Sequence, residues 1–289
     1  MAEVHEISPL IKEEILSIYK SFAAICQKYD IKHCVAFGTM LGAVRHNGFI
    51  PWDDDFDVFM LREDYEKFLT VADKELPEYF KVVTHRNCSA YPVVFGKIQE
   101  SRREVYEKIE KETDYINPHG LYIDIFPLDG VPSNVFEKFF DLMRYGTAYC
   151  RMMYLFRRGS HASLAGWVAD FVGKFLGLFY YGKKTKNDFA YILDKWLKKY
   201  PVTNRKFVRV GDISARFQRK EYTFPGDVFT KMKMVPFENT EVPVPEDFDT
   251  ALRTLYGATY MTPPPLEKRV SEHSKSEKAP WYYGPAMEK

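Results

Sequence analysis

The sequence of 289 residues is short of the features that assign a chain to a simple class. Its four cysteines, at positions 26, 34, 88 and 150, have neither a zinc-ribbon nor a thioredoxin spacing, so we interpret them as reduced thiols that fill the core. The net charge of +1 excludes a generic nucleic-acid binder, which needs a basic excess to displace counterions. The opening MAEVHEISPL has no basic region followed by an apolar run, so we expect no secretory signal and a cytoplasmic protein.

The sequence also lacks an uncharged apolar run long enough to span a bilayer. In LAGWVADFVGKFLGLFYYG, residues 164–182, apolar residues recur at helical spacing but Asp170 and Lys174 interrupt them. Residues 151–220 around it hold sixteen Lys or Arg and four Asp, a balance of +12 that leaves −11 elsewhere. Two interpretations stay open: a core helix with a basic outer side, or an amphipathic helix on an anionic membrane surface.

The sequence alternates between strand patterns and helix patterns. Hydrophobic residues make up 46% of it, which is enough to bury a sizeable core. A helix is predicted from Ser8 and Pro9 to about Tyr29, with strand patterns at 33–37, 55–60, 80–84, 91–99 and 121–128 and helices after the first two strands. Helical patterns run from about 132 to 200. A turn, a short strand and a helix follow within 237–257. The order predicts an α+β fold.

A cluster of acidic residues ends the stretch FGTMLGAVRHNGFIPWDDDFDVFM, residues 37–60. Strand alternation places Asp55 and Asp57 on one face and apolar residues on the other. Ionised neighbours repel unless a cation or a proton compensates, and carboxylate oxygens suit Mg²⁺ or Mn²⁺. The pattern therefore predicts a metal site, although Asp-rich turns in solvent are common.

A phosphate-binding turn is predicted just before these aspartates. Gly38 and Thr39 lie between a strand and a short helix, where backbone N–H groups can hold phosphate. Arg45, one turn along that helix, could clamp another phosphate oxygen or form a salt bridge with one of the aspartates. Both roles for Arg45 stay open at this point.

Two further charged residues occur inside apolar strand patterns. In GLYIDIFPLDG, Asp124 shares a face with Tyr122 and Phe126, and a buried aspartate needs a partner. If this strand lies beside the strand of Asp57, the carboxylates converge as in two-metal phosphoryl-transfer sites, and Asp124 could act as a general base. Lys97 in VVFGKIQ is a candidate phosphate ligand, or an edge-strand lysine.

Three segments resemble one family in the right order. GTMLGAVRHNGFIPWDDDFDVFMLREDYEKF is similar to the signature of LicD-type phosphocholine transferases, relatives of the fukutin-related enzymes; GLYIDIFPLDGVP and VPVPEDFDTALRTLYGATYMTPPPLEKR resemble its later motifs. The resemblance implies a nucleotidyltransferase-like mixed β-sheet core flanked by helices, with a largely helical insertion and an irregular C-terminal segment. The expected division is a catalytic core at 1–132, a basic membrane-interface or acceptor-binding region at 133–220, and a segment at 221–289 that completes the site.

The resemblance also implies a reaction: phosphocholine passes from CDP-choline to a hydroxyl of a glycan or lipid-linked glycan precursor, of teichoic acid, lipopolysaccharide or capsule type, and CMP leaves. Asp55, Asp57 and Asp124 would be catalytic and, with Asp53, would bind Mg²⁺ or Mn²⁺, expected as two ions. The implied substrate-binding residues are Gly38, Thr39, Arg45, Lys97 and Arg269. An acceptor of this kind would bring the protein to the inner face of the cell membrane as a peripheral protein.

Choline itself needs an aromatic cage, because its quaternary ammonium has no hydrogen to donate. Trp52 and Tyr122 are the candidates nearest the motifs, and Phe126, Trp281, Tyr282 and Tyr283 are also available. A ribitol or glycerol phosphate cargo would need hydrogen bonds instead. Two other functions stay open: a nucleotidyltransferase that releases pyrophosphate, and a non-catalytic adaptor at a membrane surface.

Overall fold

In the computed structural model the protein is described from residue 9 to residue 269, with gaps at 54, 90, 92, 103–120, 142, 144–147, 149, 151–170, 177–178, 180–183, 204, 212–221 and 267–268. The fold is α+β, as the sequence predicts. Within the described residues, no helix is long and apolar enough to cross a membrane.

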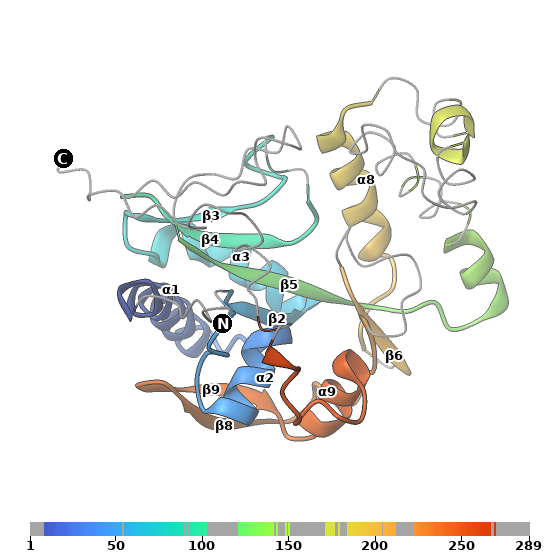
Figure 1. Ribbon diagram of the computed structural model, residues 1–289. Helices are drawn as coiled ribbons and strands as arrows, with labels where there is room; N and C mark the ends of the chain where they lie inside the picture. Colours follow the sequence, from blue (N-terminus) through green and yellow to red (C-terminus); the bar gives the residue numbers. More distant parts are fainter. Residues whose placement is uncertain are drawn as a thin grey trace.

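A mixed seven-stranded sheet forms the centre of the molecule (Figure 1). Its main path runs in the order β1-β2-β5-β4-β3, and β6 and β7 extend it beyond the end of β5. Only β2 and β5 pair in parallel; the other neighbours are antiparallel. The strands are β1 (Cys34–Val35), β2 (Asp57–Leu61), β3 (Phe80–Val83), β4 (Gly96–Glu100), β5 (Tyr122–Gly130), β6 (Phe207–Val210) and β7 (Thr223–Pro225).

Helices α1 (Pro9–Lys28) and α3 (Arg62–Glu75) contact each other and pack against β5. The predicted apolar face of α1 is confirmed, because Ile11, Ile15, Ile18 and Phe22 are all buried. Helix α2 (Phe37–His46) contacts β2, the hairpin of β8 (Met232–Phe237) and β9 (Thr240–Pro245), and α9 (Phe248–Tyr256). In Figure 1 this hairpin and α9 gather around α2 at the lower side of the molecule.

The region after β5 is only partly described. It includes a helical stretch from 135 to 141, a short π-helix η1 (Val172–Leu176) and helix α8 (Lys186–Leu197). Thr185 caps α8 in a reciprocal capping box with Asp188, which accepts from the Thr185 backbone N–H. Strands β6, β7 and β8 were not predicted, because their three to six residues carry no clean alternation.

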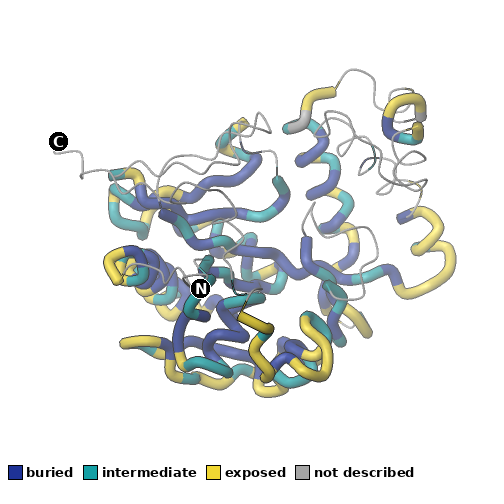
Figure 2. Tube along the Cα trace, viewed as in Figure 1, coloured by how far each residue is buried: buried dark blue, intermediate teal, exposed yellow. Residues whose placement is uncertain are grey.

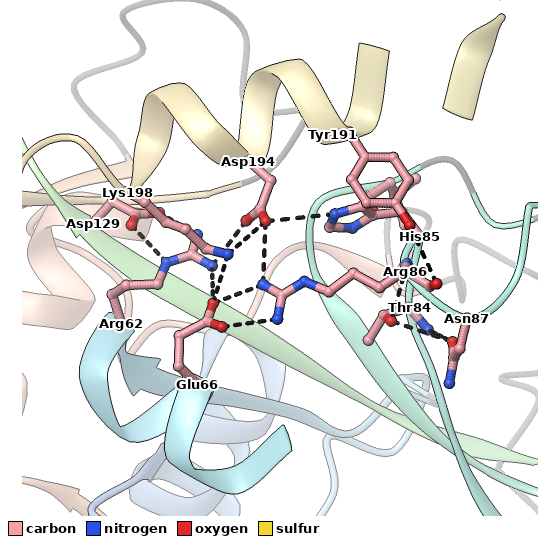
Figure 3. Close-up of polar contacts among 11 residues, drawn as sticks. Arg62, Glu66, Thr84, His85, Arg86, Asn87, Asp129, Tyr191, Asp194 and Lys198 are labelled. Carbon is pink, nitrogen blue, oxygen red and sulfur yellow. Dashed lines mark hydrogen bonds and ion pairs between the residues drawn. The ribbon is translucent and has the colours of Figure 1, made fainter. Parts of the chain in front are cut away.

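A buried ionic network joins α8 to the central sheet (Figure 3). Arg62, directly after β2, donates two hydrogen bonds to Asp129 of β5 at 2.7 and 2.6 Å. Its third nitrogen donates to Asp194 of α8 at 3.0 Å. Arg86 bridges Asp194 and Glu66 of α3. Since the Asp129 carboxylate is fully buried, its charge depends on Arg62 for compensation.

Replacing Arg62 by Met should therefore cost about 3–5 kcal/mol of unfolding free energy, since it leaves the buried carboxylate of Asp129 uncompensated and removes one cationic partner of Asp194. Urea denaturation followed by circular dichroism measures the loss. The matched control is Arg253→Met, which removes an exposed ion pair with Asp249 on α9 and should change stability little. Equal effects of the two substitutions would contradict the role of the network.

Candidate active site

The site is built where β2 and β5 lie side by side. The register of this parallel pair places Asp57, the first residue of β2, opposite Asp124 of β5. On the other side of β5, Lys97 of β4 is opposite Asp124 in the antiparallel register. The predicted convergence of the strands that carry Asp57 and Asp124 is confirmed, and it brings Lys97 to the same level of the sheet.

Helix α2 begins earlier than the sequence indicates. We expected Gly38 to end a strand and start a turn, but β1 ends at Val35 and Gly38 lies in the first turn of the helix. Phe37 has a φ of 39°, so the sharp bend falls on the residue before the glycine. No side chain caps the N-terminus at Ala36. The backbone N–H groups of this first turn therefore need acceptors from outside the helix, such as a carboxylate or another anion.

Thr39 and Gly38 each contact one part of the aspartate motif. The Thr39 hydroxyl accepts a hydrogen bond from the Asp57 backbone N–H at 2.9 Å, so this buried side chain positions the start of β2. A Cβ atom on Gly38 would lie 2.1 Å from Asp53 Oδ2. Gly38 therefore has to lack a side chain for the Asp53 carboxylate to approach the positive end of α2.

Negative charges of the aspartate motif act on Asp57. The pKa of Asp57 lies well above its ordinary value, first because of burial and then because of the negative charges of Asp55, Asp124 and Asp53; Lys97 opposes this rise. Such repulsion makes an uncompensated cluster costly. A cation or a bound proton would relieve it.

Lys97 lies in the interior of the sheet. The alternative of an edge-strand lysine is wrong, because β4 has β5 on one side and β3 on the other. The Lys97 ammonium is 3.6 Å from Asp124 Oδ1 and 3.2 Å from the centre of the Tyr122 ring. The face of Tyr122 that we expected to receive choline thus holds the cation of Lys97 in this structure. Phe126 is buried among Phe37, Phe59 and Phe95, which leaves it no open face for a cage.

A second group of charged residues lies at the end of α2. Arg45 donates from Nη1 to the Tyr260 backbone oxygen at 2.8 Å. Within the described residues it forms no salt bridge with an aspartate, so that alternative for Arg45 is wrong. The Arg269 guanidinium is 5.2 Å from the centre of the Trp52 ring. The structure therefore brings together Arg45, Trp52 and Arg269, which are far apart in the sequence.

Sequence reasoning missed two residues near these groups. The Tyr256 residue is 42% exposed, but its hydroxyl end is desolvated, and this desolvation together with the charges of Asp53 and Asp57 raises the pKa of Tyr256. His46, the last residue of α2, packs edge-on against Trp52. The sequence could not indicate Tyr256 as a site residue, because it follows the same helical pattern as the apolar residues of α9. His46 could have been predicted, because it directly follows Arg45, which was already a candidate phosphate ligand.

The ligand chemistry of the aspartate cluster suits a divalent ion. Oxygen-only carboxylate ligands and strong mutual repulsion fit Mg²⁺ or Mn²⁺. In the described part of the chain, which excludes Asp54, no three His, Cys, Asp or Glu groups have the spacing of a formed metal site. A pocket of about 500 Å³ lies elsewhere, between α1 and Asn239, and its lining contains none of these aspartates.

The site is thus a mixed sheet in which neighbouring strands bring Asp57 and Asp124 together, next to the first turn of α2. Residues 30–151 match the family "LicD/FKTN/FKRP, nucleotidyltransferase domain". This match confirms the resemblance drawn from the motifs over that stretch. The protein is an enzyme of the phosphotransferase class.

The similarity to one relative extends over most of the chain. The protein is 28% identical over 259 residues to "Lipopolysaccharide cholinephosphotransferase LicD" of Haemophilus influenzae, covering 89% of this chain and 92% of the relative. Shorter matches join it to uncharacterized proteins of Rickettsia typhi (38% identical over 71 residues, 24% of this chain and 22% of the relative) and Rickettsia prowazekii (44% identical over 55 residues, 18% of this chain and 21% of the relative).

Three of the aromatic residues that were candidates for a choline cage lie outside the described residues: Trp281, Tyr282 and Tyr283.

Replacing Asp57 by Asn should raise the thermal stability of the metal-free protein, because it removes one charge from a mutually repelling cluster. We expect Tm to rise by about 2–4 °C for each kcal/mol of repulsion relieved. Differential scanning calorimetry in EDTA measures this shift.

The matched control for this experiment is Asp73→Asn on the exposed surface of α3, which should leave Tm nearly unchanged. Added Mg²⁺ should stabilise the wild type more than Asp57→Asn. A lower Tm for Asp57→Asn in EDTA would contradict the interpretation of the cluster as repulsive.

Proposed function

We propose that the protein transfers phosphocholine from CDP-choline to a hydroxyl of a lipopolysaccharide precursor and releases CMP. The observation that carries the proposal is the alignment of Asp57 with Asp124 across β2 and β5, within the stretch that matches the LicD family. The name of the Haemophilus relative supplies the cargo and the class of acceptor. A teichoic-acid or capsule acceptor would use the same chemistry.

The aspartate cluster is proposed to hold Mg²⁺ or Mn²⁺, with Asp55, Asp57 and Asp124 as ligands and Asp53 as a further one. A divalent ion there would neutralise the diphosphate and stabilise the charge that develops on the leaving oxygen. The acceptor hydroxyl would attack the β-phosphorus in line, and Asp124 would accept its proton. The bond from the β-phosphorus to the bridging oxygen breaks, and CMP leaves with that oxygen.

The surrounding residues are proposed to orient the donor. Backbone N–H groups at Gly38 and Thr39 and the cations of Lys97, Arg45 and Arg269 would hold phosphate oxygens. Lys97 would have to leave the Tyr122 ring, 3.2 Å away, for that ring to take choline. Trp52 is the other ring proposed to contact the cargo, and Arg269 already lies near it.

The metal-dependent release of CMP from CDP-choline tests this function. Asp57→Asn and Asp124→Asn should each lower the rate by about 10³-fold or more, because each removes charge that organises the phosphates. Anion-exchange chromatography of the products, with and without a lipopolysaccharide precursor extract, measures CMP. Asp73→Asn on α3 serves as the control and should keep the wild-type rate.

Other outcomes separate the alternatives. Release of CMP from CDP-ribitol or CDP-glycerol but not from CDP-choline would keep the mechanism and replace the cargo. Pyrophosphate from CTP would indicate a nucleotidyltransferase. Full activity of Asp57→Asn would contradict the catalytic role of the cluster, and no product from any donor would favour the adaptor.

The region 133–220 is proposed as the part that meets the membrane and the acceptor, with 1–132 as the catalytic core and 221–289 as the segment that completes the site. Exposed apolar side chains gather there: Phe136 and Phe139 after β5 are 78% and 56% exposed, and Phe171 and Phe175 at η1 are 53% and 55% exposed. Figure 2 shows the segment after β5 as mostly exposed. These exposures favour interfacial attachment over the core alternative for Phe171 and Phe175.

Flotation with phosphatidylcholine vesicles that contain phosphatidylserine tests this attachment. The double variants Phe136→Asp/Phe139→Asp and Phe171→Asp/Phe175→Asp should each reduce the bound fraction by roughly tenfold, since each loses two apolar anchors. The matched control is Met234→Asp on β8, which is also about half exposed and should float like the wild type. Equal flotation of all folded variants would contradict the proposal.

A further inference from the structure

Two arginines beside the aspartate cluster are held by neutral partners. Arg45 donates to the Tyr260 backbone oxygen at 2.8 Å, and Arg269 donates from Nε to the Pro264 backbone oxygen at 2.8 Å. In the described ranges neither arginine forms an ion pair with a carboxylate. Burial lowers the pKa of Arg45, Tyr256 opposes this, and the charge of Arg269 lowers it further.

Partly desolvated cations without carboxylates are stabilised by a bound anion, because an anion compensates both burial and mutual repulsion. Trp52 connects this group to the acidic one. It directly precedes Asp53 in the chain, and its ring lies beside both the His46 ring and the Arg269 guanidinium. The cationic group is thus a neighbour of the aspartate cluster.

His46 is the third member of the cationic group. Arg45 Nε donates to His46 Nδ1 at 3.4 Å, so the proton of the neutral ring lies on Nε2. The His46 ring stands edge-on to Trp52 at 6.1 Å and 89°, and the same indole lies near Arg269. Within the described residues, no group accepts a hydrogen bond from Nε2. His46 therefore has a fixed ring and one unused donor.

We propose that Arg45, His46 and Arg269 form an anion site for the diphosphate of a nucleoside diphosphate donor, in which His46 is a positioning residue through its Nε2–H. This inference rests on the proposed function and adds His46 to it. A diphosphate fits better than a single carboxylate, because the site offers three donors next to a cluster that requires a cation. Oxygens of one diphosphate can contact both groups at once.

The simplest alternative is that His46 only packs against Trp52 at the end of α2. Two substitutions separate the roles. His46→Gln keeps an N–H near the position of Nε2, whereas His46→Asn keeps an acceptor near Nδ1 and loses the distal donor. If His46 only packs, both substitutions should change anion affinity by similar amounts. If His46 donates a hydrogen bond, the Gln variant should keep more of the affinity than the Asn variant does.

Titration calorimetry with inorganic pyrophosphate in Mg²⁺ buffer tests the site directly, with CDP-choline as the second probe. His46→Asn should weaken pyrophosphate binding by about 10- to 100-fold, the usual loss for a hydrogen bond to a charged group. His46→Gln should stay within about threefold of the wild type. The control Lys81→Gln changes an exposed cation on β3, at the opposite edge of the sheet's main path from β1, and should bind as the wild type does.

The outcomes distinguish this inference from the proposed function. Wild-type affinity of His46→Asn, or equal losses in Asn and Gln variants that unfold at the wild-type Tm, would overturn the donor role. If pyrophosphate binding shows the expected order but no CDP donor releases CMP, the anion site stands and the transfer reaction falls. If CMP is released, His46→Asn should raise KM for the donor by the same factor with little change in kcat.

Discussion

The register between β2 and β5 is the constraint on which the site depends. It places Asp57 opposite Asp124 at one end of the parallel pair. At the other end, Arg62 follows β2 and binds Asp129 of β5 with two hydrogen bonds. A slip of one residue would turn every side chain to the other face and would separate both pairs. The buried ion pair and the aspartate cluster are therefore fixed by the same alignment.

The two ends of this strand pair have opposite energetics. At the Arg62 end, each buried carboxylate has a cationic partner, so the charges help to hold α8 against the sheet. At the Asp57 end, carboxylates repel one another and Lys97 compensates only in part. Repulsion among the carboxylates at the Asp57 end can persist because the buried ion pairs at the Arg62 end and the buried core keep the strands in place. That stored repulsion is what a divalent ion would relieve.

Much of the core followed from the sequence, since long amphipathic patterns such as α1 and buried strands such as β5 have strong periodicity. Asp55 and Asp57 could be predicted because neighbouring carboxylates repel, and Asp124 because a charge in an apolar strand needs a partner; both arguments hold wherever the strands pack. The start of α2 at Phe37 and the interior place of Lys97 could not be predicted. Both depend on which strands become neighbours, and local pattern does not carry that information. The gathering of Arg45, His46 and Arg269 likewise requires the C-terminal segment to fold back on α2.

The central claim is that the aspartates on β2 and β5 hold a divalent ion next to a cationic group that holds the diphosphate. The most direct measurement is a crystal structure with Mn²⁺ and a non-hydrolysable CDP-choline analogue, with anomalous scattering recorded at the manganese edge. The account predicts an anomalous peak within ligand distance of Asp57 and Asp124, with the diphosphate between that peak and Arg45. A manganese peak away from both aspartates, or a diphosphate bound outside this region, would contradict it.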